Sequence, residues 1–90
     1  MTFQPAKGVA VEVEVRLPQE GMGMTEAVLV EWRKSVGESV EKDDVIAEFE
    51  AAKATVEVTA PAAGRLIRLL YEPGDTVPVR EVVAAIEATG

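Results

Sequence analysis

One lysine stands among small side chains in the stretch FEAAKATVEVTAP, residues 49–61. Ala51, Ala52 and Ala54 leave the amine of Lys53 accessible, and a strand-like alternation of side chains follows it. The pKa of an exposed lysine amine is about 10.4, so the amine is charged at neutral pH and is a poor nucleophile. Acylation of Lys53 would therefore require a separate enzyme that brings an activated acyl donor and takes up the proton. We predict that a turn at the tip of a β-hairpin presents this lysine for modification.

Carboxylates on the flanking strands are the other candidates for chemistry. Glu48, Glu50 and Glu57 occupy outward-facing positions of the predicted hairpin. Paired carboxylates suit hydrolysis where their surroundings raise the pKa of one of them, and outward-facing strand neighbours are expected to have no pocket that does so. We therefore expect a docking surface or an ordinary solvated face, and no catalytic residue.

Composition excludes several other classes of protein. The chain has no cysteine and no histidine, so it lacks a thiol nucleophile, a disulfide framework and the usual acid–base residue near neutral pH. A net charge of −7 repels phosphate backbones, which argues against nucleic-acid binding. No apolar run approaches the roughly 20 residues of a membrane span, and no signal peptide or metal-ligand cluster is recognisable. We expect a soluble, cytoplasmic, monomeric domain with no membrane partner.

Short alternating runs between frequent glycines and prolines predict an all-β fold. Residues 9–17 and 56–59 alternate valine with polar or small side chains, and residues 45–50 place Val45, Ala47 and Phe49 on one face. Ile46 then shares the solvated face of that strand with Glu48 and Glu50. We expect a flexible tail over residues 1–8 and a single domain over residues 9–90.

An internal repeat predicts how the strands are arranged. Residues 27–50 align with residues 64–87 without a gap, at an offset of 37. The identical pairs are Leu29 with Leu66, Gly37 with Gly74, Val40 with Val77, Val45 with Val82, Ala47 with Ala84 and Glu50 with Glu87. Each copy exposes an apolar face that another sheet must cover, so we expect two copies packed face to face about an approximate two-fold axis. The alternative is two similar hairpins in an unrelated β-fold. In the two-fold arrangement, the Lys53 turn and the C-terminal residue Gly90 lie at opposite ends.

Five segments together resemble the lipoyl domains of 2-oxoacid dehydrogenase complexes. They are GMGMTEAVLVEW (21–32), VGESVEKDDVIAEFE (36–50), KATVEV (53–58), APAAG (60–64) and EPGDTV (72–77). The resemblance implies a flattened barrel or sandwich of two four-stranded antiparallel sheets, with internal two-fold symmetry. It also implies that lipoic acid is attached to Lys53 by an amide bond, and that the domain is a non-catalytic swinging arm.

The same resemblance implies a set of partners and of recognition residues. The partners would be a lipoate ligase or lipoyl transferase, a thiamine diphosphate-dependent 2-oxoacid dehydrogenase, an acyltransferase core and dihydrolipoamide dehydrogenase. Met22, Gly23 and Met24 lie in a loop that, in lipoyl domains, is near the modified lysine and helps partners to distinguish one domain from another. Alternatively, the two methionines close the end of the sandwich.

One position departs from the lipoyl pattern. The usual turn has aspartate before the lysine, where this chain has Ala52, so a side-chain hydrogen bond within the turn is missing. Glu50-Ala51-Ala52-Lys53 also shares its Glu-Ala part with biotinyl domains, which have the same fold. A biotin carrier domain of a carboxylase and an unmodified lipoyl-like interaction domain therefore remain as alternatives, and a glycine-cleavage carrier is disfavoured by the short chain.

Overall fold

The protein is built from strands, described by a computed structural model for residues 10–21, 23–52 and 54–89. Within these ranges the strands are β1 (Ala10–Arg16), β2 (Glu26–Trp32), β3 (Ser39–Val40), β4 (Val45–Ala51), β5 (Ala54–Thr59), β6 (Gly64–Leu69), β7 (Thr76–Pro78) and β8 (Val82–Thr89). The same residues include no helix that is long and apolar enough to cross a membrane. The prediction of an all-β fold is confirmed.

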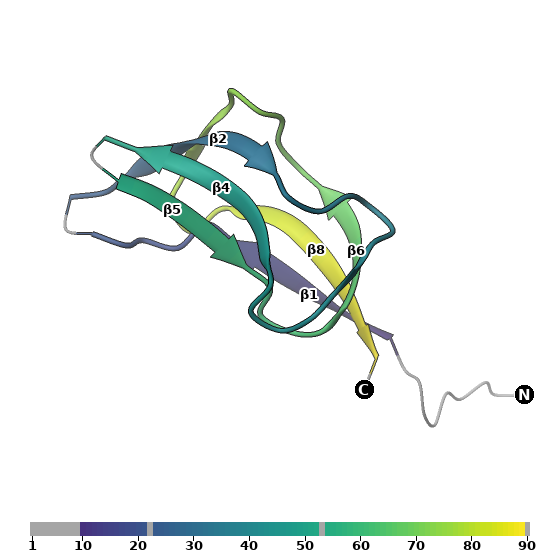
Figure 1. The fold of residues 1–90 in the computed structure, drawn as a ribbon. Coiled ribbons are helices and arrows are strands. Elements are labelled where there is room, and N and C mark those ends of the chain that lie inside the picture. The colour runs from purple at the N-terminus through teal and green to yellow at the C-terminus, as the bar shows by residue number, and fades with distance from the viewer. Residues whose placement is uncertain (1–9, 22, 53, 90) are drawn as a thin grey trace, which may run out of the picture.

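Two four-stranded antiparallel sheets form the two layers of the domain. One has the strand order β1-β8-β6-β3 and the other has the order β5-β4-β2-β7. The curved sheets lie over each other in Figure 1. The predicted flattened sandwich is therefore confirmed, and each sheet contains strands from both halves of the chain.

The internal repeat is visible in matching hydrogen bonds. The Gly37 amide donates to the Leu66 carbonyl at 2.7 Å. In the second copy, the Gly74 amide donates to the Leu29 carbonyl at 2.8 Å. The glycine amide in the turn of each copy thus donates its hydrogen bond to a strand of the other copy. This reciprocal pattern is expected of an approximate two-fold axis.

Backbone conformation repeats at the same offset. Asp43 and Arg80, which are 37 positions apart, have positive φ values of 76° and 74°. No other non-glycine residue in the described ranges has a positive φ. A left-handed conformation is unfavourable for a residue with a side chain, so its recurrence at equivalent positions indicates that both turns have the same geometry.

The duplication also includes β1 and β5, which a gapless alignment of the two copies omits. The Leu17 amide donates to the Glu81 carbonyl at 3.1 Å. The Ala60 amide donates to the carbonyl of Asp44, the equivalent of Glu81, at 2.9 Å. Leu17 and Ala60 are therefore equivalent although they lie 43 positions apart rather than 37. The chain from Leu17 to Ala27 is consequently six residues longer than the chain between their equivalents, Ala60 and Gly64.

Apolar side chains from both sheets fill the space between the layers. The largest of them are Phe49, Leu17, Leu29, Ile46, Leu66 and Ile86, all essentially inaccessible to solvent. No buried polar or charged side chain occurs among the described residues. Burial of apolar surface is the main stabilising contribution in such a core.

One prediction for β4 is wrong. Ile46 was expected on the solvated face of the strand, but it is fully buried, as is its neighbour Ala47. The register between β4 and β5 shifts between Val45 and Ala47, which breaks the strict two-residue alternation. Both side chains can therefore point into the core.

The hairpin formed by β4 and β5 lies at one end of the sandwich. In Figure 1, the tip of this hairpin and the last residues of β8 are at opposite ends of the domain. The hairpin tip is thus distant from the end of β8, which agrees with the predicted arrangement, while Lys53 and Gly90 themselves lie outside the described residues.

Candidate functional site

The β4–β5 hairpin is positioned by its inward-facing side chains. Phe49 pairs with Val56 across the two strands, and both side chains are buried in the core. Pairing continues to Ala51 and Ala54 at the tip. The packed base holds the hairpin in place, so its tip has a defined position relative to both sheets.

Small side chains surround the predicted modification site. Ala52 and Ala54 are exposed and Ala51 is half-buried. Lys53 itself lies outside the described residues. The predicted hairpin is confirmed by the pairing of Ala51 with Ala54, whereas the role of Lys53 stays a prediction.

The connection between β1 and β2 approaches the hairpin tip. Gly23 and Met24 line a groove of about 570 Å³ together with all three hairpin alanines. A turn in which the Met24 amide donates to the Gly21 carbonyl at 3.1 Å shapes this connection. The predicted proximity of this loop to the hairpin therefore holds for Gly23 and Met24, while Met22 lies outside the described residues.

The groove itself is a feature that the sequence did not indicate. Glu50, which was expected to have no pocket beside it, lines the groove. Glu26 from β2 lines it as well. The groove depends on the connection before β2 meeting the hairpin of β4 and β5, and no local pattern in the sequence signals such a meeting.

The three predicted recognition carboxylates lie on the outer face of the hairpin sheet. Glu48 pairs with Glu57 across β4 and β5, and Glu50 and Glu57 are exposed. Glu48 forms an ion pair with Arg33, whose Nε also lies 2.6 Å from Glu31 Oε2. The hydrogen bond with Glu48 is the main cause that raises the pKa of Arg33. Within the described ranges, no group of three or more carboxylates is placed to hold a metal ion.

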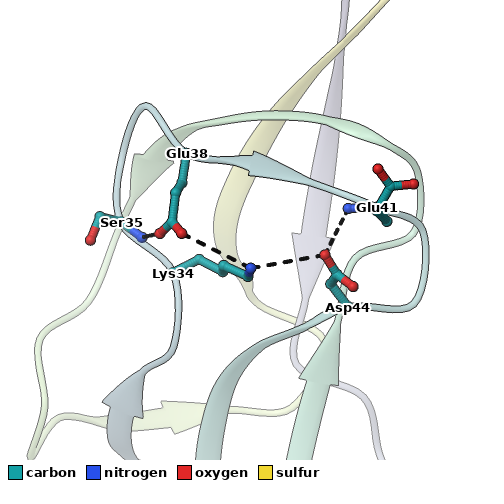
Figure 2. Close-up of polar contacts among 5 residues, drawn as sticks. All are labelled: Lys34, Ser35, Glu38, Glu41 and Asp44. Atoms are coloured by element: carbon teal, nitrogen blue, oxygen red, sulfur yellow. Dashed lines mark hydrogen bonds and ion pairs between the residues drawn. The ribbon is translucent and has the colours of Figure 1, made fainter.

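Lys34 has a different environment, at the junction of two turns (Figure 2). Its Nζ lies 4.0 Å from both Glu38 Oε2 and Asp44 Oδ2. The two carboxylates also accept hydrogen bonds from turn amides, Glu38 from Ser35 and Asp44 from Glu41, each at 2.8 Å. Lys34 therefore links two turns of the fold and is not presented at a hairpin tip.

Comparison with known proteins places these features in context. A family model described as "Biotin-requiring enzyme" (Biotin_lipoyl) matches residues 13–86. The dihydrolipoyllysine-residue succinyltransferase component of the 2-oxoglutarate dehydrogenase complex of Bartonella vinsonii subsp. berkhoffii is 43% identical over 75 residues, or 83% of this chain. The lipoamide acyltransferase component of the branched-chain alpha-keto acid dehydrogenase complex of Pseudomonas aeruginosa is 41% identical over 76 residues, or 84% of this chain. The chain spans 18% of the length of each of these two curated relatives.

Solved structures show the same fold. The lipoyl domain of the 2-oxoglutarate dehydrogenase complex from Azotobacter vinelandii is 27% identical, with a TM-score of 0.65. The match covers 90% of this chain and all of that domain. The urea carboxylase of Kluyveromyces lactis has a TM-score of 0.73 at 24% identity, over 84% of this chain and 6% of that enzyme. The fold is therefore found both in lipoyl domains and within a carboxylase.

Proposed function

The chain belongs to the Biotin_lipoyl family, and from that premise we propose that it is a covalent lipoyl carrier with Lys53 as its attachment residue. The proposed role is to shuttle acyl groups and electrons between the active sites of a 2-oxoacid dehydrogenase complex. The domain is proposed to do this without catalytic residues of its own. Support comes from relatives whose names describe lipoamide or dihydrolipoyllysine acyltransferase components.

One observation carries the proposal: the hairpin tip on either side of position 53 consists of small side chains held by a buried base. Ala52 and Ala54 are exposed and offer little steric hindrance to an enzyme that approaches the lysine between them. The pair Phe49 and Val56 anchors the strands below. These residues fit a lysine amide, because they combine a fixed position with open access.

The chemistry of transfer belongs to the cofactor, while the domain positions it. When bound, the dithiolane of lipoic acid accepts an acyl group together with two electrons. The two sheets supply a rigid base for the arm. The hairpin tip and the end of β8 lie at opposite ends of the domain (Figure 1). A domain tethered beyond β8 would therefore hold Lys53 away from the tether, which raises the effective concentration of the arm at partner active sites.

The proposed partners follow from this role. They are a lipoate ligase or lipoyl transferase for loading, and a thiamine diphosphate-dependent 2-oxoacid dehydrogenase, an acyltransferase core and dihydrolipoamide dehydrogenase for the reaction cycle. Some of these enzymes are proposed to contact residues near the hairpin or on its outer face. These residues are Gly23, Met24, Glu50 and Glu57. The proposed compartment is the cytoplasm.

Loading in vitro tests the attachment residue. The protein would be incubated with ATP, lipoate and a lipoate ligase, and its intact mass would be measured, with a biotin ligase and biotin in a parallel reaction. We expect the mass of one lipoyl group on the wild type and none on Lys53→Arg. Lys42→Arg is the matched control, because Lys42 is an exposed turn lysine elsewhere in the fold.

Each alternative function predicts a different pattern of masses. Loading by the biotin ligase alone would favour a biotin carrier, which the Glu50-Ala51 sequence keeps under consideration. No loading by either enzyme would favour an unmodified interaction domain. Lipoylation that persists in Lys53→Arg would show that the attachment residue is wrong.

A further inference from the structure

Presentation of a lysine does not explain the groove beside the hairpin. Its volume of about 570 Å³ falls within the range of sites that enclose drug-sized molecules. It lies between the β4–β5 hairpin and the connection from β1 to β2. Both chain neighbours of Lys53, Ala52 and Ala54, line it.

The wall opposite the hairpin comes from the part of the chain that breaks the two-fold symmetry. The β1–β2 connection has nine residues and the equivalent β5–β6 connection has four. Residues from this longer connection, including Glu20, Gly23 and Met24, line the groove. The longer connection thus forms one side of the groove beside the hairpin tip.

Inside, the groove is mostly apolar. Ala27 and Val56 are core residues that also line it. Met24 and Ala51 are half-buried, pack against the core and contribute apolar surface. The charged lining residues, such as Glu26 and Glu50, are exposed to solvent. An occupant would therefore be an uncharged, largely aliphatic group.

We propose that this groove receives the arm of a lipoyl group attached to Lys53 and shelters its dithiolane between transfers. The inference rests on the proposed function. Formation of the amide removes the charge of the lysine, so the arm that starts between Ala52 and Ala54 is neutral and aliphatic. Removing its methylene groups from water is favourable, and the thioether of Met24 is a polarisable neighbour for ring sulfur. Docking is reversible, so the arm is released when a partner enzyme binds it.

Chemical access to the disulfide measures docking without any activity assay. Loading is first confirmed by intact mass. One molecule of dithiothreitol then reduces the dithiolane to the dithiol, supplying two electrons and two protons and becoming a cyclic disulfide itself. Loss of the near-ultraviolet absorbance of the dithiolane gives the rate. We expect reduction about fivefold slower than for free lipoamide, which corresponds to a docked state about four times as populated as the free one.

Two groove variants and one matched control test whether the arm docks in this groove. Met24→Ala removes part of the apolar wall, and Ala54→Glu places a charge in the groove. Both are expected to bring the rate to that of free lipoamide. Ala63→Glu makes the same change of charge at an exposed alanine that does not line the groove, and its rate should equal that of the loaded wild type.

NMR of the loaded wild type makes the test independent of how the variants fold. Docking predicts nuclear Overhauser effects between dithiolane protons and the methyl groups of Met24 and Ala54. Equal reduction rates for the loaded domain and lipoamide, without these effects, would overturn the inference while leaving lipoylation intact. Slow reduction that neither groove variant changes would also overturn it. Shifts at Met24 that arise only when a partner enzyme is added would assign the groove to that partner instead. If the wild type acquires no lipoyl mass, the proposed function fails and this inference fails with it.

Discussion

Substitution of Gly64 by alanine should weaken the domain strongly, because this glycine lies against a neighbouring strand. A Cβ atom at position 64 would lie 2.8 Å from Ile86 Cγ2 and 2.9 Å from the Glu87 carbonyl carbon, and it would also collide with the Glu87 carbonyl oxygen. The obstacle on β8 is backbone, which cannot move aside as a flexible side chain can. The equivalent residue in the first copy is Ala27, which carries the extra methyl and lines the groove.

The expected decrease in the free energy of unfolding has two parts: the cost of overpacking, and a smaller opposite effect from the entropy of the unfolded chain. Forcing an extra methyl into a packed site costs about 1–3 kcal/mol, and the upper end applies here because the contact is with backbone. Replacing glycine by alanine restricts the unfolded chain, which stabilises the folded state by about 0.4–1 kcal/mol. The net loss is therefore about 2 kcal/mol, out of roughly 5–13 kcal/mol expected for a domain of this length.

Urea unfolding measures this loss. Trp32, the only tryptophan in the chain, is half-buried against the core and reports unfolding by its fluorescence. With a urea dependence of about 1 kcal/mol per molar, the midpoint should fall by about 2 M. Gly21→Ala is the control for a glycine with open space around it and should move the midpoint by less than about 0.5 M. Gly37→Ala, at a φ of +95°, isolates backbone strain and should cost about 1–2 kcal/mol. A midpoint for Gly64→Ala within the range of the Gly21 control would refute the close approach of β6 to β8.

Four other substitutions test the loading site, the hydrogen bond of Trp32 and the two equivalent turns. Ala52→Asp should raise the initial rate of lipoylation about threefold by adding a hydrogen bond within the turn, and an equal or lower rate by intact mass would show that the missing hydrogen bond does not limit loading. Trp32→Phe should cost about 1 kcal/mol in urea unfolding followed by circular dichroism, because the indole Nε1 donates to the Tyr71 carbonyl at 3.0 Å. Glu38→Ala and Asp75→Ala should each lower the free energy of unfolding by about 1 kcal/mol, since each carboxylate accepts a hydrogen bond from the amide three residues earlier, at 2.8 and 2.9 Å. Losses that differ by more than the contribution of the exposed ion pair between Lys34 and Glu38, at most about 1 kcal/mol, would contradict the equivalence of the two turns.

Much of the fold was predictable because it follows from short-range patterns in the sequence. Alternation in β5 placed Val56 and Val58 in the core, and both are buried. The repeat at an offset of 37 predicted equivalent turns, and Asp43 and Arg80 share their conformation. In these places the local chemistry and the global arrangement make the same demand on the chain.

Errors arose where inserted residues disturbed a regular pattern. Ile46 was placed on the solvated face because strict alternation was assumed, whereas the register shift beside it turns the side chain inward. The equivalence of β1 and β5 was missed because the β1–β2 connection carries extra residues. Both are insertions, of one residue or of several, and a fixed period cannot represent an insertion.

The sequence by itself determined the strands, the duplication, the family resemblance and the placing of Lys53 between small residues in a hairpin. Only the tertiary structure decided what surrounds that hairpin. Met24 lies in the β1–β2 connection and Val56 lies in β5. They line one groove because the folded sheets bring this connection against the β4–β5 hairpin. Periodicity in the sequence indicates which way a side chain points from its own strand. A groove, however, depends on the distance between segments that are remote in the chain. That distance is set by the packing of the whole core.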